Sequence, residues 1–373
     1  MNQPRPVLLR LLPVVLLAVL LVACAEKEPV RIGFMGGVSG RFADLGTTGR
    51  NGVMLAVEWR NERGGVAGRK ITLSIKDDQQ DPEKARQALK ELVAEGVTAV
   101  LGPMTSSIAA AIVPEADRAG MLLVGGTVTT SGLTGKDDNF VRTISTTSEY
   151  GSHAARSYRQ HYGYKRAALI YDLANRDYTE NWANEFSRTF ISEGGKIVKS
   201  QGFDSRTEQD YAALAAQLLQ SKPDLVVIAA NSVDGALFAQ KLRQRDVHVR
   251  LAGSAWTGTQ RLMELGGAAV EGMLIEQYYN QDDSSESYRR FREAYLKRFG
   301  YEPGFAGVVA FDAANMLLDA LAENPDRKGL KERILKRAPF KGVQGDIAID
   351  AYGDAQRPIT MTEVRDGKII VVR

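Results

Sequence analysis

Short apolar segments alternate with longer amphipathic stretches along most of the chain. Runs of β-branched and apolar residues predict buried strands, and stretches with apolar positions three and four residues apart predict helices. The predicted strands cover residues 30–35, 69–75, 97–101, 121–124, 166–171, 196–200, 224–229, 249–252 and 272–275. The predicted helices cover residues 50–61, 83–95, 150–161, 180–193, 208–220 and 235–245, and another begins at Thr105-Ser106-Ser107. This alternation indicates parallel sheets covered by helices on both faces.

The alternation restarts near residue 144, and it is too long for one open sheet. A chain of 373 residues is also long enough for two domains of ordinary size. We therefore predict two doubly wound α/β lobes. Beyond residue 280 the pattern predicts three helices, followed by short strands near the end of the chain. These helices cover residues 285–299, 306–322 and 328–337, and the strands cover 346–350, 359–364 and 368–372.

The strand at 97–101 runs into Gly-Pro and then into Thr105-Ser106-Ser107, which is typical of a tight turn and a helix start. Unpaired amides and hydroxyl groups at such a helix start suit a small anion. The next strand ends in a second loop, 125–130, which also carries hydroxyl residues. In a parallel sheet the two loops lie side by side, so together they could hold a carboxylate. The alternative is that both loops only connect strands to helices, as in many α/β sheets.

Residues 1–23 are typical of a signal peptide, because Arg5 and Arg10 precede a short apolar run that ends at Val22. The sequence Leu21-Val22-Ala23-Cys24 resembles the lipobox of bacterial lipoproteins, in which the cysteine is acylated after cleavage. Cys24 is the single cysteine, so the chain has neither an intramolecular disulfide nor a cysteine-based metal site. Residues 24–29 form a polar linker. We expect a soluble periplasmic or extracytoplasmic domain, anchored to the membrane by a lipid on Cys24.

Composition and charge exclude several classes of function. Hydrophobic residues make up 44% of the chain and charged residues 25%, which is typical of a globular protein. The net charge of +3 falls to +1 when Arg5 and Arg10 leave with the signal peptide. A nearly neutral exported chain is not expected to bind nucleic acid. The glycine-rich loop 36–46 lacks the G-x-G-x-x-G spacing of dinucleotide sites, so we expect no nicotinamide cofactor, nor any other.

No catalytic or metal site is predicted. The acidic pair Asp77-Asp78 follows a strand and precedes the helix-capping Asp81-Pro82, without the spacing of metal ligands. The histidines His153, His161 and His248 have no nucleophile nearby in the sequence. We therefore expect a binding protein and not an enzyme.

The order of these features resembles the branched-chain amino acid binding proteins of ABC importers, which are type I periplasmic binding proteins, over nearly the whole mature chain. The resemblance is carried by Ile32-Gly33, Ser39-Gly40 with Gly46, residues 61–68, Asp77-Asp78 with Asp81-Pro82, residues 100–103 with Ser106-Ser107, residues 140–143, Lys222-Pro223-Asp224, Gly253, Glu271-Gly272 and Phe311-Asp312-Ala313. It implies two Rossmann-like lobes joined by three crossovers, with the ligand in the cleft between them. It places crossovers near 143–144, 275–276 and 342–344, which assigns residues 30–143 and 276–342 to the first lobe and 144–275 and 343–373 to the second.

The resemblance also implies a ligand site. The ligand carboxylate would meet the side chain of Ser106, the backbone of Thr127 and the side chain of Thr129. An aromatic ring from the second lobe would cover the ligand, and Tyr178 matches its position. The aromatic residue expected in the first loop aligns with Leu45.

One departure from the family pattern leaves the ligand open. The acid that commonly binds the α-ammonium aligns near Ala255, beside Trp256. Asn231 and Asp234 could replace that acid. Alternatively, the ligand is a carboxylate without an amine, and an aromatic one could stack on Trp256 or Tyr178. Trp256 could equally belong to the core of its lobe.

The expected function is that of a receptor which binds a small carboxylate, either a branched-chain or hydrophobic amino acid or a related aromatic or aliphatic acid. Its lobes would close on the ligand and present it to ABC permease subunits. The alternative is a ligand sensor that uses the same clamp to address a signalling protein.

Overall fold

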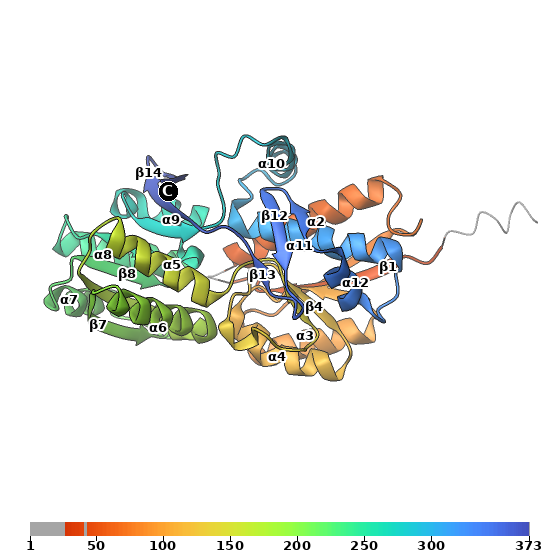
Figure 1. Ribbon diagram of the computed structural model, residues 1–373, viewed down its shortest axis with the longest axis horizontal. Coiled ribbons are helices and arrows are strands. Elements are labelled where there is room, and N and C mark those ends of the chain that lie inside the picture. Colours follow the sequence, from red (N-terminus) through yellow and green to blue (C-terminus); the bar gives the residue numbers. More distant parts are fainter. Residues whose placement is uncertain (1–26, 41–42, 373) are drawn as a thin grey trace, which may run out of the picture.

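The computed structural model describes residues 27–40 and 43–372, which form two α/β lobes lying side by side (Figure 1). The first lobe is built on a five-stranded sheet with the order β2-β1-β3-β4-β5. Its strands are β1 (Val30–Gly36), β2 (Ile71–Asp77), β3 (Ala99–Leu101), β4 (Leu122–Gly125) and β5 (Phe140–Arg142). All neighbouring strands in this sheet are parallel, as the sequence predicts.

The second lobe is built on a seven-stranded sheet with the order β15-β14-β10-β9-β8-β6-β7. Its strands are β6 (Arg166–Asp172), β7 (Lys196–Phe203), β8 (Leu225–Ala229), β9 (Leu251–Gly253), β10 (Leu274–Gln277), β14 (Thr360–Arg365) and β15 (Lys368–Val371). The first five of these strands are parallel, whereas β14 and β15 add an antiparallel edge. Mixed sheets of this kind are common when a late hairpin joins a parallel sheet.

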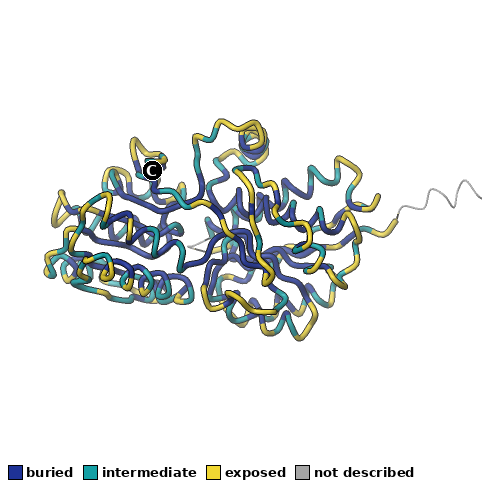
Figure 2. The backbone as a smooth tube through the Cα atoms, in the orientation of Figure 1, coloured by how far each residue is buried: buried dark blue, intermediate teal, exposed yellow. Residues whose placement is uncertain are grey.

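Helices cover both faces of each sheet, and the alternation of side chains along the strands explains why. In β8, Leu225 and Val227 pack in one hydrophobic cluster with α5 and α6, while Val226 and Ile228 pack in another with α7 and α8. Successive strand residues point to opposite faces, so a strand that is apolar throughout needs cover on both. Buried residues accordingly run through the interior of each lobe and through the junction between them (Figure 2).

The helices have the following bounds: α2 (Asp44–Glu62), α3 (Pro82–Ala94), α4 (Ser106–Arg118), α5 (Thr147–Gln160), α6 (Arg176–Ser192), α7 (Tyr211–Gln220), α8 (Ser232–Arg245), α9 (Gln260–Gly266), α10 (Glu286–Phe299), α11 (Gly304–Glu323) and α12 (Leu330–Arg337). Four 3-10 turns accompany them among the described residues: η1 (Ser131–Leu133), η2 (Leu173–Asn175), η3 (Ala255–Thr257) and η4 (Gly267–Val270). Within the described part of the chain, α11 alone is long and apolar enough to cross a membrane, but 83% of its apolar window is buried in the protein.

Helix α2 begins at Asp44, six residues earlier than predicted, and includes glycines that the sequence analysis left in the preceding loop. Close packing against α11 depends on a further glycine, Gly52, which lies inside the predicted helix. A Cβ atom on Gly52 would lie 2.3 Å from the carbonyl oxygen of Gly307. The usual cost of glycine in a helix is therefore offset here by the close approach of the two backbones.

Two segments predicted as loops contain helical turns. The segment expected as a loop at 172–179 forms η2 and the start of α6, so Tyr178 lies on a helix. Asp172 stabilises this turn, because its Oδ1 accepts a hydrogen bond from the amide of Ala174 at 3.0 Å. The predicted loop through Trp256 contains η3 and leads into α9. Both turns are too short to give a helical hydrophobic pattern.

The end of the chain pairs differently from the expectation, which assigned everything from residue 343 onward to the second lobe. Strands β11 (Phe340–Gly342), β12 (Gly345–Ile349) and β13 (Ala355–Gln356) form a separate three-stranded sheet. This small sheet contacts the first lobe, where the Arg142 Nε donates to Asp354 Oδ1 at 2.7 Å. The chain enters the seven-stranded sheet only with β14, so the strand pairing favours a passage at 357–359 over the one expected at 342–344.

Candidate functional site

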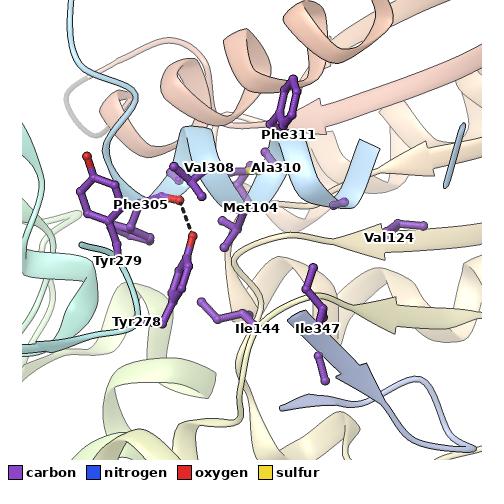
Figure 3. Packing of buried hydrophobic residues seen from close by; sticks show 14 of the residues in the cluster. Met104, Val124, Ile144, Tyr278, Tyr279, Phe305, Val308, Ala310, Phe311 and Ile347 are labelled. Carbon is purple, nitrogen blue, oxygen red and sulfur yellow. Dashed lines mark hydrogen bonds between the residues drawn. The ribbon is translucent and has the colours of Figure 1, made fainter. Parts of the chain in front are cut away.

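A narrow cavity lies between the lobes, and both of them contribute to its walls. Its lining residues are Leu45, Met104, Thr105, Ser106, Thr127, Thr129, Ile144, Tyr150, Asn175, Tyr178, Ala255, Trp256 and Phe305. The space among these side chains measures about 390 Å³ including its open part, and about 30 Å³ of it admits the centre of a water molecule. Figure 3 shows Met104 and Phe305 on the first-lobe side of this space, with Ile144 at the crossover below them. Only a small molecule fits such a space.

The loops after β3 and β4 meet at one end of the cavity, because the two strands are parallel neighbours. The Ser106 Oγ, in the first turn of α4, accepts hydrogen bonds from the amides of Thr129 at 3.3 Å and Thr130 at 3.2 Å. A hydroxyl that already accepts two hydrogen bonds is set to donate its own proton to a third partner. Ser106 is therefore oriented as a donor at the end of the cavity where α4 begins.

The threonines of the second loop are held in place by first- and second-lobe neighbours. The Thr127 hydroxyl donates to the carbonyl of Met104 at 2.6 Å, which leaves its backbone as the group that can face a ligand. The Thr129 hydroxyl accepts from the Thr147 hydroxyl at 3.1 Å, at the start of α5. This arrangement leaves the Thr129 proton for another acceptor.

Aromatic rings from the second lobe form the opposite wall. Tyr178 lies in the first turn of α6, and Trp256 lies in η3. Their ring centroids are 6.1 Å apart in an edge-to-face arrangement, and the Trp256 amide donates to the Tyr178 hydroxyl at 3.4 Å. Leu45 faces the cavity from the first lobe. Apart from the hydroxyl end, the walls are largely apolar.

The described residues that line the cavity carry no charge. The carboxyl group of Glu276 is fully buried behind Ala255. Its Oε1 accepts hydrogen bonds from the Trp182 indole at 2.8 Å and from the Ala255 amide at 3.2 Å, while Oε2 has no partner. Burial raises the pKa of Glu276 to about 8, so this carboxyl is mostly protonated at pH 7.

Hydrogen bonds join the lobes on both sides of the cavity. Asp44, at the start of α2, accepts from the Ser232 hydroxyl at 2.7 Å and from the Thr259 hydroxyl at 2.8 Å. On the other side, the Ser107 hydroxyl donates to Asp177 at 2.8 Å. The structure therefore represents a closed arrangement of the two lobes.

Comparison with known proteins identifies the family. The family model described as periplasmic binding protein matches residues 29–368. The chain belongs to the periplasmic binding protein family. The resemblance inferred from the sequence and the predicted two-lobed α/β fold are thereby confirmed. Membership implies a substrate-binding protein located outside the cytoplasm.

Relatives of this periplasmic binding protein are similar over most of its length. A Leu/Ile/Val-binding protein homolog 2 from Brucella abortus is 26% identical over 349 residues, which is 91% of both chains. The solved leucine binding protein from Thermotoga maritima is 26% identical, with a TM-score of 0.86, and covers 92% of this chain and 98% of its own. A solute binding protein from R. palustris, solved in complex with benzoate, is 20% identical with a TM-score of 0.84 and shares the fold over 92% of this chain and 95% of its own.

In this periplasmic binding protein, six of the residues singled out from the sequence line the cavity together: Leu45, Ser106, Thr127, Thr129, Tyr178 and Trp256. Asn231 and Asp234 do not. The Asn231 Oδ1 accepts the Asp234 amide at 3.0 Å as the N-cap of α8, and its Nδ2 donates to Asp234 Oδ2 at 2.5 Å. Asp234 also accepts from the Tyr211 hydroxyl at 2.5 Å. Neither residue lines this cavity, and their role towards a ligand amine stays a prediction.

The sequence analysis missed several lining residues, above all Tyr150 and Asn175. Tyr150 lies one turn into α5, where a tyrosine in an amphipathic pattern indicates core packing. Asn175 lies in η2, where its Oδ1 accepts the Ser107 amide from the other lobe at 3.0 Å. Neither role has a sequence signal, because each depends on how the lobes meet.

Proposed function

We propose that this chain is the solute-binding lipoprotein of an ABC importer, and that it binds a small monocarboxylate without an ammonium group between its lobes. The observation that supports this most directly is the composition of the cavity. Hydroxyl groups and a helix start lie at one end, aromatic and aliphatic side chains form the walls, and no charged residue is present among the described lining residues.

The hydroxyl end suits a carboxylate. Ser106 and Thr129 each have a proton to donate, and the first turn of α4 adds the partial positive charge of a helix start. We therefore assign the ligand carboxylate to Ser106, Thr127 and Thr129. Leu45, Tyr178 and Trp256 would then enclose the apolar part of the ligand.

The opposite wall does not suit an ammonium group. Ala255 stands where relatives with an α-ammonium site carry an acid, and Glu276 behind it is mostly protonated at pH 7. A buried ammonium without a charged partner would cost on the order of several kcal/mol. The benzoate bound by the relative from R. palustris is an example of an amine-free acid, whereas the curated relatives are named for branched-chain amino acids.

Matched ligand pairs test this proposal with the purified protein. Thermal shift and calorimetry would compare leucine with 4-methylpentanoate, phenylalanine with 3-phenylpropanoate, and both pairs with benzoate. We expect at least one amine-free acid to stabilise the protein by several degrees at saturation, and leucine not to do so. Tighter binding of leucine than of 4-methylpentanoate would overturn the assignment of an amine-free ligand. Absence of binding by every acid would overturn the carboxylate site.

The lipid anchor is a separate part of the proposal. The signal peptide at 1–23 and Cys24 lie outside the described residues, and the lipobox-like sequence supports the proposal. Labelling cells with a fatty acid should mark the wild-type protein, and Cys24→Ser should lose both the label and the membrane association. A Cys24→Ser variant that stays in the membrane fraction would contradict the anchor.

The permease partners and the lobe boundaries complete the proposal. We place residues 30–143 and the segment from 278 to 356 in the first lobe, and 144–277 and 357–373 in the second, following the strand pairing. Uptake of the labelled ligand should fall in cells that lack this protein. Unchanged uptake with an altered response to the ligand would instead indicate the sensor.

A further inference from the structure

Tyr150 presents a buried hydroxyl group that the closed protein does not satisfy. The residue is 1% exposed, and it lines the cavity from the first turn of α5. Its hydroxyl has no hydrogen-bond partner. Burial raises the pKa of this phenol, so it is a neutral donor at physiological pH.

Four other hydroxyls of the cavity wall have hydrogen-bond partners. Ser106 accepts two amides, Thr127 donates to a carbonyl, Thr129 accepts from Thr147, and Tyr178 accepts the Trp256 amide. Among the buried side-chain atoms of the described lining residues, only the Tyr150 hydroxyl is left without a partner. A buried polar group of this kind is expensive unless something hydrogen-bonds to it.

Tyr150 belongs to the second lobe and lies three residues after Thr147, whose hydroxyl donates to Thr129 at 3.1 Å. The charged and titratable groups that act on it are Arg357, Glu276, Tyr178 and Glu149. Tyr178 and Glu276 belong to the wall around Ala255, opposite the Ser106 end. Since Ser106, Thr127 and Thr129 are already assigned to the carboxylate, the acceptor left for Tyr150 is a second polar group of the ligand.

We propose that the Tyr150 hydroxyl donates a hydrogen bond to a second oxygen on the bound acid, so that the protein prefers hydroxylated monocarboxylates over unsubstituted ones. This inference rests on the proposed function and extends it. The carboxylate binds at the first-lobe loops, and the second oxygen is recognised by α5 when the lobes close. Tyr150 thereby acts as a specificity residue.

The test compares benzoate with 3-hydroxybenzoate and 4-hydroxybenzoate in the wild type, in Tyr150→Phe and in Tyr158→Phe. Tyr158 is a matched control: it lies on the same helix and is also fully buried, but it does not line the cavity, and its hydroxyl donates to the Leu274 carbonyl at 3.5 Å. Calorimetry gives the affinities, and thermal unfolding of the ligand-free protein shows whether the hydroxyl has a structural role.

We expect the wild type to bind one hydroxybenzoate more tightly than benzoate, and Tyr150→Phe to lose roughly 3- to 10-fold for that ligand alone. The ligand-free Tyr150→Phe protein should unfold at the wild-type temperature or above, because an unsatisfied hydroxyl is removed. Tyr158→Phe should keep the wild-type ligand preference.

Two results would overturn this inference while leaving the proposed function intact. One is that the wild type binds benzoate but binds its hydroxylated forms no more tightly, or that Tyr150→Phe binds the hydroxylated forms as tightly as the wild type does. The other is that ligand-free Tyr150→Phe unfolds at a lower temperature, which would show a structural partner for the hydroxyl. If no acid, including those of the matched pairs above, binds the wild type, the proposed function itself fails and this inference fails with it.

Discussion

At the Ser106 hydroxyl, two backbone amides from the loop after β4 meet the first turn of α4. We predict that Ser106→Ala weakens binding of the best amine-free acid by on the order of 1.5–3 kcal/mol, because a hydrogen bond to a charged group is lost. Calorimetry measures this loss. Ser39→Ala is a matched control, since the Ser39 hydroxyl donates to Asp77 outside the cavity. Equal affinity in Ser106→Ala and wild type would remove Ser106 from the site.

Glu276 makes stability depend on pH. Its pKa is about 8 in the folded protein and near 4.5 when unfolded, so the folded state holds the proton more tightly between these values. Its contribution is therefore complete below about pH 4.5 and is lost as the pH rises towards 8, with a slope of at most about 1.4 kcal/mol per pH unit.

We predict that Glu276→Gln, which cannot titrate, reduces this slope. Denaturant unfolding at pH 5, 6, 7 and 8 would compare the variant with the wild type. The difference between the two proteins isolates Glu276 from Asp78, whose pKa is also raised by burial, to about 7. Parallel stability curves for the two proteins would show that Glu276 is already ionised at pH 5.

At the residue scale, the sequence was informative where the chemistry is local. A strand that ends in Gly-Pro and Thr105-Ser106-Ser107 predicts hydroxyls at a helix start, and the parallel pairing of β3 with β4 brings the second loop beside it. Tyr150 and Glu276 could not be recognised in the same way. Both look like core residues in the sequence, and their unsatisfied atoms become apparent only when neighbouring helices and strands are in place.

At the scale of elements, the start of α2 joins the lobes through Asp44. Its carboxylate accepts hydrogen bonds from Ser232, at the start of α8, and from Thr259, just before α9. Both bonds join elements of different lobes, so they stabilise the closed arrangement without touching the ligand.

We predict that Asp44→Asn lowers ligand affinity roughly 3- to 30-fold, because hydrogen bonds to a charged acceptor are weakened only in the closed form. Calorimetry measures the affinity, and small-angle scattering with ligand should show a larger radius of gyration than for the wild type. Ser232→Ala should have a smaller effect, which is not additive with that of Asp44→Asn. Wild-type affinity in Asp44→Asn would show that these contacts do not control closure.

At the start of α2, the pattern of apolar residues is insufficient to predict where the helix begins. Glycines at the start of α2 argue against a helix in the sequence, but a Cβ atom on Gly46 would lie 2.1 Å from the carbonyl oxygen of Gly37, so a close backbone approach accounts for that glycine. The turn η2 is capped by Asp172, and Asn175 and Asp177 at its end and at the start of α6 contact Ser107 of the other lobe, which one short stretch of sequence does not reveal. Elements with long periodic patterns, such as α10 and α11, were predicted to within two residues at each end.

At the scale of the whole molecule, Arg357 connects all three passages of the chain between the lobes. Its Nε donates to the Thr143 carbonyl at 2.6 Å, its guanidinium lies 4.7 Å from the centre of the Tyr278 ring, and it sits at the third passage itself. The guanidinium also pairs with Asp312 of α11 at 2.6 Å, and both side chains are 2% exposed. The sequence predicts the third passage at 342–344, whereas the strand pairing favours a later one, because β11 and β13 are only two or three residues long and pair with partners that their own pattern does not indicate.

Because this ion pair is buried, removing one of its partners should lower the free energy of unfolding far more than removing one partner of an exposed pair. We predict that Arg357→Met lowers the free energy of unfolding by about 3–5 kcal/mol, since it leaves the Asp312 carboxylate buried without its partner. Arg365→Met is the matched control: Arg365 pairs with Glu363 at the surface, where its side chain is 54% exposed, and its loss should cost about 0–1 kcal/mol. Denaturant unfolding measures both variants.

A second substitution separates the charge from the packing of Arg357. Asp312→Asn keeps an acceptor for the Val343 amide, which now donates to Asp312 Oδ1 at 2.9 Å, while removing the negative charge. Combined with Arg357→Met, it should recover part of the lost stability, because no uncompensated charge is then buried. If the double variant is no more stable than Arg357→Met alone, then the Thr143 and Tyr278 contacts, and not the ion pair, account for the loss. The three passages would in that case be held together mainly by the stacking and carbonyl contacts of one side chain.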